Sequence, residues 1–190
     1  HDQVEPADRP LLDRLLSADE TVREAAAREW EEARLAALPE YGPNHWPPSP
    51  VAALSDEVDP LDPWAVRKKR MMTALVTALQ TGAETQRVAA ARSIRDLAPA
   101  YTSVIDVLAA TLTDAPAPVR LDVMRTLGGI THLSGGRYVD TKLGEVVACI
   151  EDVDAGVRAA ALRLVGLRIR YGHANDGLRR HAQALALKAS

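Results

Sequence analysis

The chain has 190 residues and a net charge of −3, with 47% hydrophobic and 26% charged residues, a balance that indicates a folded globular protein rather than a disordered chain. Its one cysteine, Cys149, excludes an intrachain disulfide and a cysteine-based zinc site. No apolar run approaches the roughly 18–20 residues that a membrane-spanning helix needs, so we expect a cytoplasmic protein without membrane contact.

The predicted elements are helices, and they come in pairs along the chain. These pairs cover residues 11–16 and 21–38, 64–79 and 84–97, 102–112 and 117–131, and 139–150 and 155–170. Gly82 favours a turn inside the second pair, and Pro116 and Pro118 suit the entry of the helix at 117–131, where a missing N–H costs little. A further apolar stripe begins at Leu178, which predicts one more helix that either caps the array or starts a fifth pair.

Four stretches of the chain can be aligned on the residue pair that opens each second helix. The aligned pairs are Val22-Arg23, Gln86-Arg87, Val119-Arg120 and Val157-Arg158. The same alignment superimposes three sets of apolar residues, which are Leu15, Leu79, Leu112 and Ile150; Leu11, Leu75, Leu108 and Val146; and Ala26, Ala90, Val123 and Ala161. Self-similarity at this period indicates a stacked helical repeat, in which each unit buries its apolar face against its neighbours.

The repeat resembles HEAT repeats, in which a short turn carrying Asp leads into a second helix that opens on Val-Arg. Asp114 and Asp152 each lie six residues before their repeat arginine, as that pattern requires, and alanine runs such as residues 25–27 resemble the bacterial, phycobilin lyase-like type. The pattern is broken at Ser17, Thr81 and Gln86. The resemblance implies an all-α, right-handed α-solenoid of about four HEAT-like helix pairs plus a C-terminal helix, forming one domain over residues 1–190. It also implies structural roles for the repeat arginines, which would pair with turn aspartates: Arg23, Arg87, Arg120 and Arg158.

A proline-rich insertion at about residues 39–63 separates the first repeat from the second and carries seven of the chain's twelve prolines. Its aromatic candidates for partner contacts, counting the residue just after it, are Tyr41, His45, Trp46 and Trp64. Aromatic side chains on a stiff loop make good binding hot spots. The alternative is that Trp46 folds back and covers the gap between the first two repeats.

A second candidate surface comes from the arginines six residues after each alignment mark, namely Arg28, Arg92, Arg125 and Arg163. At 100° per residue these positions point about 140° away from the core, toward solvent. In HEAT arrays the second helices usually line the concave surface, so the four would form a basic stripe for an acidic peptide, a phosphate or a nucleic acid. The alternative is a solvated helix face whose charge is offset by glutamates such as Glu24 and Glu32.

Charge is divided unevenly along the chain. Residues 1–66 carry 15 acidic and 5 basic side chains, whereas residues 67–190 carry 11 acidic and 18 basic ones. The basic part opens with the run Arg67, Lys68, Lys69 and Arg70, which either binds phosphate or forms a solvated helix turn beside acids such as Asp56 and Asp62.

No residue pattern indicates a catalytic, metal or cofactor site. The histidines show no metal-ligand spacing, and Cys149 lies in an apolar helix, where a buried and inert thiol is expected. Gly128-Gly129 indicates a helix terminator rather than a phosphate loop.

The sequence therefore favours a non-enzymatic scaffold, monomeric, that binds another protein through its concave surface and the insertion. One alternative is a nucleic-acid-binding protein similar to HEAT-like alkylpurine DNA glycosylases, since the last two thirds of the chain is basic. The other is an enzyme similar to bilin lyases, which rests on the alanine-rich repeats alone.

Overall fold

The computed structural model describes residues 4–37, 56–97, 101–132 and 142–170. Within these ranges every regular element is a helix, so the predicted all-α class is confirmed. None of the helices in this part of the chain combines the length and apolar character that crossing a bilayer demands.

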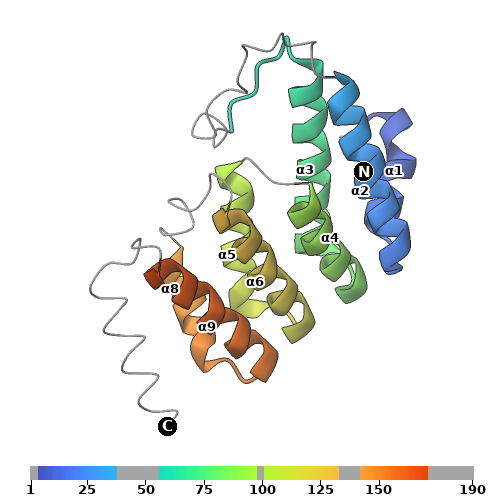
Figure 1. The fold of residues 1–190 in the computed structure, drawn as a ribbon. Helices are drawn as coiled ribbons and strands as arrows, with labels where there is room; N and C mark the ends of the chain where they lie inside the picture. Colours follow the sequence, from blue (N-terminus) through green and yellow to red (C-terminus); the bar gives the residue numbers. More distant parts are fainter. Residues whose placement is uncertain (1–3, 38–55, 98–100, 133–141, 171–190) are drawn as a thin grey trace.

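The helices form four consecutive pairs, which we number units one to four (Figure 1). Unit one contains α1 (Arg9–Leu15), preceded by a 3₁₀ turn at Pro6–Asp8, and α2 (Glu20–Ala37). Unit two contains α3 (Pro63–Thr81) and α4 (Glu84–Asp96). Unit three contains α5 (Thr102–Asp114) and α6 (Ala117–His132). Unit four contains α8 (Leu143–Ala148), followed by a 3₁₀ turn at Cys149–Glu151, and α9 (Ala155–Arg170).

The bounds of several helices differ from the sequence prediction by a few residues. The helix expected to reach residue 150 ends at Ala148, and its last turn tightens to 3₁₀ geometry, with the Asp152 N–H donating to the Cys149 carbonyl at 3.2 Å. Gly128 and Gly129 do not terminate α6, which continues to His132. Packing of α6 between α4 and α9 outweighs the roughly 1 kcal/mol that each glycine costs in a helix. The helix predicted from Leu178 lies outside the described residues.

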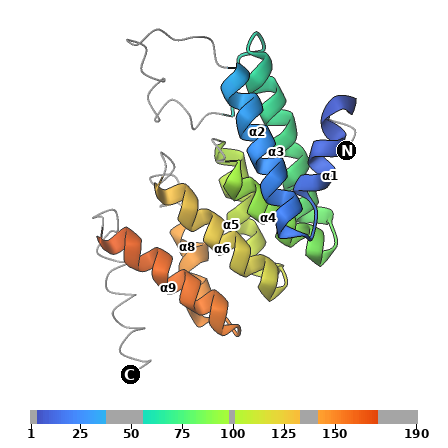
Figure 2. The same ribbon diagram turned by 45° about the vertical axis from the view of Figure 1, so that its right-hand side comes forward.

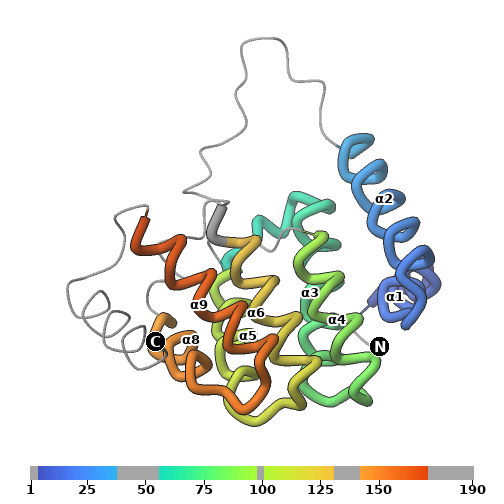
Figure 3. The backbone as a smooth tube through the Cα atoms, turned by 60° about the horizontal axis from the view of Figure 1, so that its bottom comes forward, coloured from blue at the N-terminus to red at the C-terminus, as the bar shows by residue number. Residues whose placement is uncertain are grey.

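The pairs stack so that first helices and second helices form separate layers. α4 packs on α3 and α6, and α6 in turn packs on α5 and α9. Figures 2 and 3 show α4, α6 and α9 following one another in front of α3, α5 and α8, with α2 at the far end of the row. We call the outer surface of α2, α4, α6 and α9 the second-helix face.

The apolar residues that the repeat alignment superimposes form the core between the layers. All twelve are buried, from Leu11 in unit one to Ala161 in unit four. Gln86, which replaces the usual valine, is exposed, and its side-chain oxygen accepts the Ala83 N–H at 3.3 Å at the start of α4. At this position Gln86 therefore caps the start of α4, whereas the equivalent valines of the other units are more buried.

The four repeat arginines bind carbonyls in the last turn of the first helix or in the turn that follows it. Arg23 donates to Ser17 at 2.7 Å, and Arg87 donates to Leu79 at 2.8 Å. In the same way, Arg120 donates to the Ala115 carbonyl and Arg158 to the Asp152 carbonyl. The last carbonyls of a helix lack intrahelical partners and carry partial negative charge, so a cation there stabilises the turn.

Buried hydroxyls connect neighbouring units. Ser93 in α4 donates to the carbonyl of Leu15, the last residue of α1, at 2.6 Å. Thr126 in α6 occupies the same repeat position, and its hydroxyl lies 2.8 Å from both the Ala91 carbonyl of α4 and the Asp122 carbonyl of its own helix. Both hydroxyls thus contact the preceding unit.

Candidate functional site

The four arginines of the predicted basic stripe lie on the second-helix face, one on each second helix. Arg28 on α2, Arg125 on α6 and Arg163 on α9 are exposed, and Arg92 on α4 is half-buried. The structure therefore brings them to one face in chain order. It divides them between two grooves, which differ in charge.

Asp122 connects the two central arginines. Its carboxylate is only 5% exposed and accepts from Arg92 at 3.0 Å and from Arg125 at 3.4 Å, one oxygen for each. The hydrogen bond to Asp122 raises the pKa of the Arg92 guanidinium above its ordinary value. Arg92 is consequently tied to unit three, whereas Arg125 has a longer contact and half of its side chain in solvent.

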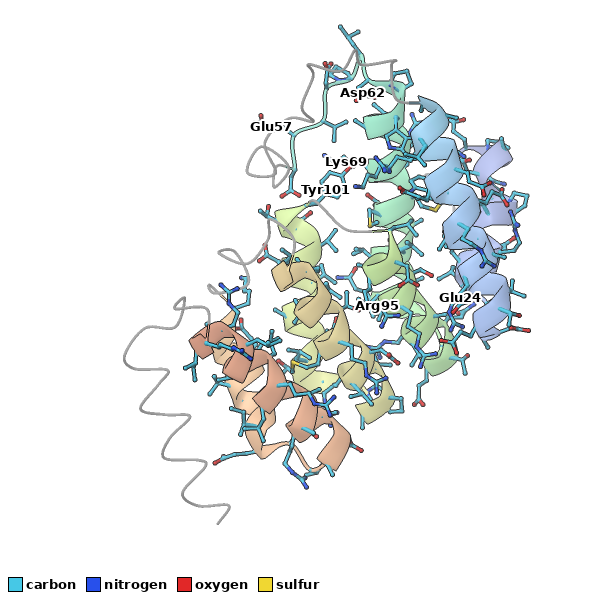
Figure 4. All side chains as sticks on the ribbon, viewed as in Figure 1. Glu24, Glu57, Asp62, Lys69, Arg95 and Tyr101 are labelled. Atoms are coloured by element: carbon cyan, nitrogen blue, oxygen red, sulfur yellow. The ribbon has the colours of Figure 1, made fainter. Side chains whose placement is uncertain are left out.

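The first groove, of about 280 Å³, lies between α2 and α4. Figure 4 shows Glu24 on α2 and Arg95 on α4, which line it from opposite sides. Its charged lining residues are mixed in sign, namely Arg23, Arg28, Arg92 and Arg95 with Glu20, Glu24 and Asp96. Arg95 pairs with the adjacent Asp96 at 3.1 Å, so part of the positive charge is neutralised within the groove.

The second groove, of about 290 Å³, lies between α6 and α9. Its charged lining residues are two arginines, Arg125 and Arg163, and no carboxylate lines it among the residues described. The remaining lining is small or apolar, made of Gly128, Gly156, Ala159, Ala160, Leu121, Met124, Leu164 and Leu167. We call this the α6–α9 groove.

The basic run at residues 67–70 does not form one anion site, because its members point to different partners. Arg67 binds Asp8, Arg70 pairs with Glu5, and Lys69 donates to the Asp56 carbonyl. Burial lowers the pKa of the Lys68 ammonium, which also lies near Arg34. The run therefore connects α3 to the N-terminal residues and to the end of the insertion.

An aromatic and charged cluster at units one and two was not foreseen from the sequence. Trp64, considered above as a candidate contact residue, packs on buried Trp30 with ring centroids 4.6 Å apart. The Arg67 guanidinium lies 5.2 Å from the Trp30 ring and 5.3 Å from the Trp64 ring, and forms two short bonds to Asp8, at 2.6 and 2.9 Å. Trp64 thus contributes to the junction of α2, α3 and the 3₁₀ turn at Pro6–Asp8.

Of the insertion, the structure describes residues 56–63, so Tyr41, His45 and Trp46 lie outside it. Asp56 binds the start of α5, accepting from the Thr102 hydroxyl at 2.6 Å and the Ser103 hydroxyl at 2.7 Å. A pocket of about 150 Å³ lies beside this contact, between α3 and α5, with Lys69 and Tyr101 among its lining residues (Figure 4). Burial, assisted by the charge of Asp56, raises the pKa of Tyr101 to about 12.

Neither a metal-binding cluster nor a reactive thiol is found in the described ranges. No group of three or more His, Cys, Asp or Glu side chains in those ranges is arranged to hold a metal ion. Cys149 is buried, and burial raises the pKa of its thiol, which keeps it in the unreactive protonated form at neutral pH.

The chain matches no family model and no curated protein. The second-helix face and its grooves are therefore the features that bear on function.

Proposed function

We propose that the protein is a non-enzymatic scaffold, a right-handed HEAT-like α-solenoid, that binds another protein through its second-helix face. The observation that carries this proposal is the placement of the four stripe arginines, one per unit, along a single face beside two grooves: Arg28, Arg92, Arg125 and Arg163. Arginine presents several donors in a planar fork and is enriched in protein interfaces. A face of this kind offers charged contacts at several points along an extended partner.

Charge on the same face favours a protein over a nucleic acid. Glu20, Glu24 and Asp96 line the α2–α4 groove, and Asp122 neutralises part of the charge of Arg92 and Arg125. A phosphate backbone would meet these carboxylates at close range, whereas a protein can present both signs of charge. We therefore rank DNA binding second.

The proposal can be tested by site-specific cross-linking in lysate of the organism that makes the protein. The photoreactive residue p-benzoylphenylalanine replaces Glu24 or Ala159, one beside each groove of the second-helix face. In the control it replaces Ala110, which is exposed on α5 in the other layer. We expect a discrete adduct from one or both test positions that protease removes and nuclease leaves intact, and none from Ala110.

Other outcomes would assign a different function. An adduct that nuclease removes, together with a salt-sensitive gel shift on duplex DNA, would replace the protein partner by nucleic acid. Saturable binding of a tetrapyrrole by the purified protein would favour the lyase-like alternative. Adducts from Ala110 alone would place the interface on the first-helix layer and contradict the proposal.

A further inference from the structure

The α6–α9 groove differs from the α2–α4 groove in both charge and polarity. Its charged lining residues are Arg125 and Arg163, while carboxylates and arginines face each other in the other groove. The two grooves therefore suit different parts of a partner. The α6–α9 groove offers only positive charge and apolar surface, so the ligand that fits it is easier to infer.

Small residues keep the α6–α9 groove open. Gly128 and Gly156 lack side chains, and Ala159 and Ala160 add only methyl groups. A Cβ atom built on Gly128 would meet no atom within 4 Å apart from its own helix turn. A partner's backbone can approach this surface closely, which larger side chains at these positions would prevent.

Apolar walls give the groove a preference for an aliphatic side chain. Met124 and Leu164 are buried at its base, and Leu121 and Leu167 are half-buried beside them. The groove has a volume of about 290 Å³, which is enough space for one or two aliphatic side chains of a peptide.

The two arginines set the charge of the occupant. Within the described ranges, Arg163 is exposed and its side chain forms no ion pair or hydrogen bond, and Arg125 keeps half its side chain in solvent beside Asp122. An incoming carboxylate can pair with Arg163 without displacing a protein partner. A phosphate would gain the same charge contacts, but the apolar walls between the arginines would offer it nothing.

We propose that the α6–α9 groove binds a short acidic peptide segment of a partner protein, with an aliphatic side chain in the groove and flanking carboxylates on Arg125 and Arg163. This inference rests on the proposed scaffold function and narrows it to one groove and one class of ligand.

The test uses a fluorescein-labelled synthetic peptide, Glu-Asp-Leu-Glu-Asp, and measures its anisotropy with the full chain at low salt. We expect saturable binding that weakens as salt rises, because exposed charges are screened. The peptide with Gln and Asn in place of its acids, and the peptide with Gly in place of Leu, should each bind at least about tenfold more weakly, a change typical of losing one good contact.

Two variants of the protein address the two halves of the inference. Arg163→Glu reverses a rim charge, and Gly128→Leu fills the groove without meeting another side chain at its Cβ. Each should weaken peptide binding about tenfold or more. The matched controls Arg9→Glu, an exposed arginine on α1, and Gly144→Leu, at an open position on α8, should change it less than about twofold.

Several results would overturn the inference about the α6–α9 groove. The scaffold function is tested independently of them by the cross-linking experiment. These results are equal binding of the neutral peptide, loss of binding on Arg28→Glu instead of Arg163→Glu, and no binding of the peptide at all. Competition by heparin together with indifference to the Leu-to-Gly peptide would make the groove a general anion surface. Sedimentation showing dimers that Arg163→Glu abolishes would replace the partner peptide by a second copy of the chain.

Discussion

Arg120 of unit three binds Asp152 of unit four instead of Asp114 in its own turn. Its Nε lies 2.8 Å from Oδ2 and its Nη2 lies 2.7 Å from Oδ1, and both side chains are largely buried. Asp114 holds the same repeat position one unit earlier and is exposed. Arg120 therefore pairs with a turn aspartate of the next unit, and this contact joins units three and four.

Asp152→Asn should destabilise the protein by about 1.5–3 kcal/mol, because Arg120 would lose hydrogen bonds to a charged acceptor in a nearly buried site. The matched control Asp114→Asn should stay within about 0.5 kcal/mol, as is usual for exposed positions. Urea denaturation measures both. If the two variants lower the free energy of unfolding equally, the ion pair between Arg120 and Asp152 adds nothing to the stability of the protein.

The same pair predicts a loss of stability in acid. The hydrogen bond from Arg120 lowers the pKa of Asp152, and the N–H of Asp154 assists while burial opposes the change. A carboxylate whose folded pKa is lowered contributes stability above its unfolded pKa of about 4, and loses it as pH falls toward the folded value. The wild-type protein should thus lose more stability below about pH 4 than Asp152→Asn does. Parallel curves of unfolding free energy against pH would contradict this.

Arg67→Lys should cost about 1–3 kcal/mol, because lysine can neither bind Asp8 with two nitrogens nor stack on both tryptophans. Arg70→Lys is the matched control three residues away, where an exposed pair with Glu5 should contribute less than about 1 kcal/mol. Thermal unfolding followed by tryptophan fluorescence measures the change, since Trp30 and Trp64 are two of the chain's three tryptophans. If both variants melt together, the cluster is held by the Trp30–Trp64 contact alone.

Ser93→Ala should destabilise by about 1–3 kcal/mol, because it leaves the buried carbonyl of Leu15 without its donor. Thr77→Ala removes a hydroxyl that bonds within its own helix on the exposed side of α3, and should have an effect of less than about 0.5 kcal/mol. Hydrogen exchange localises the change, which should appear first in α1. Exchange that increases elsewhere and not in α1 would rule out this assignment.

Asp56→Ala should destabilise by about 0.5–2 kcal/mol, the usual cost of losing a helix cap, because Asp56 accepts from groups at the first turn of α5. Although burial opposes it, the hydrogen bonds from Thr102 and Ser103 lower the pKa of Asp56, so this contribution too should disappear in acid. Asp13→Ala, at an exposed site on α1, is the control. Amide exchange at Ser103 that matches the wild type would refute the role of Asp56.

Local periodicity was sufficient to predict the core but not the contacts between distant segments. Leu79, Leu112 and their equivalents are buried as expected because a helix with a regular apolar stripe can bury only that face. Asp8 and Arg67 lie 59 positions apart, and nothing periodic relates them. Their pairing depends on where α3 returns after the insertion, which only the packed chain determines.

The candidate site was likewise predicted in part. The spacing placed Arg28 and Arg163 correctly on the solvent side of their helices, since that follows from the helical period. It gave no indication that Asp122 would join Arg92 to Arg125, or that glycine and alanine would open a groove between α6 and α9. The Asp122 contacts and the groove both depend on the distance between neighbouring helices, which cannot be predicted from the sequence of one helix.

The contact from Asp56 to α5 has a consequence for how the array unfolds. Units that touch only their neighbours can melt one after another, as in a one-dimensional chain. Asp56 precedes unit two in sequence but binds Thr102 at the start of unit three, 46 positions later, and so closes a loop around the whole of α3 and α4. Unit two cannot leave the array without opening this loop. We expect units two and three to melt as one cooperative block, with unit four outside it.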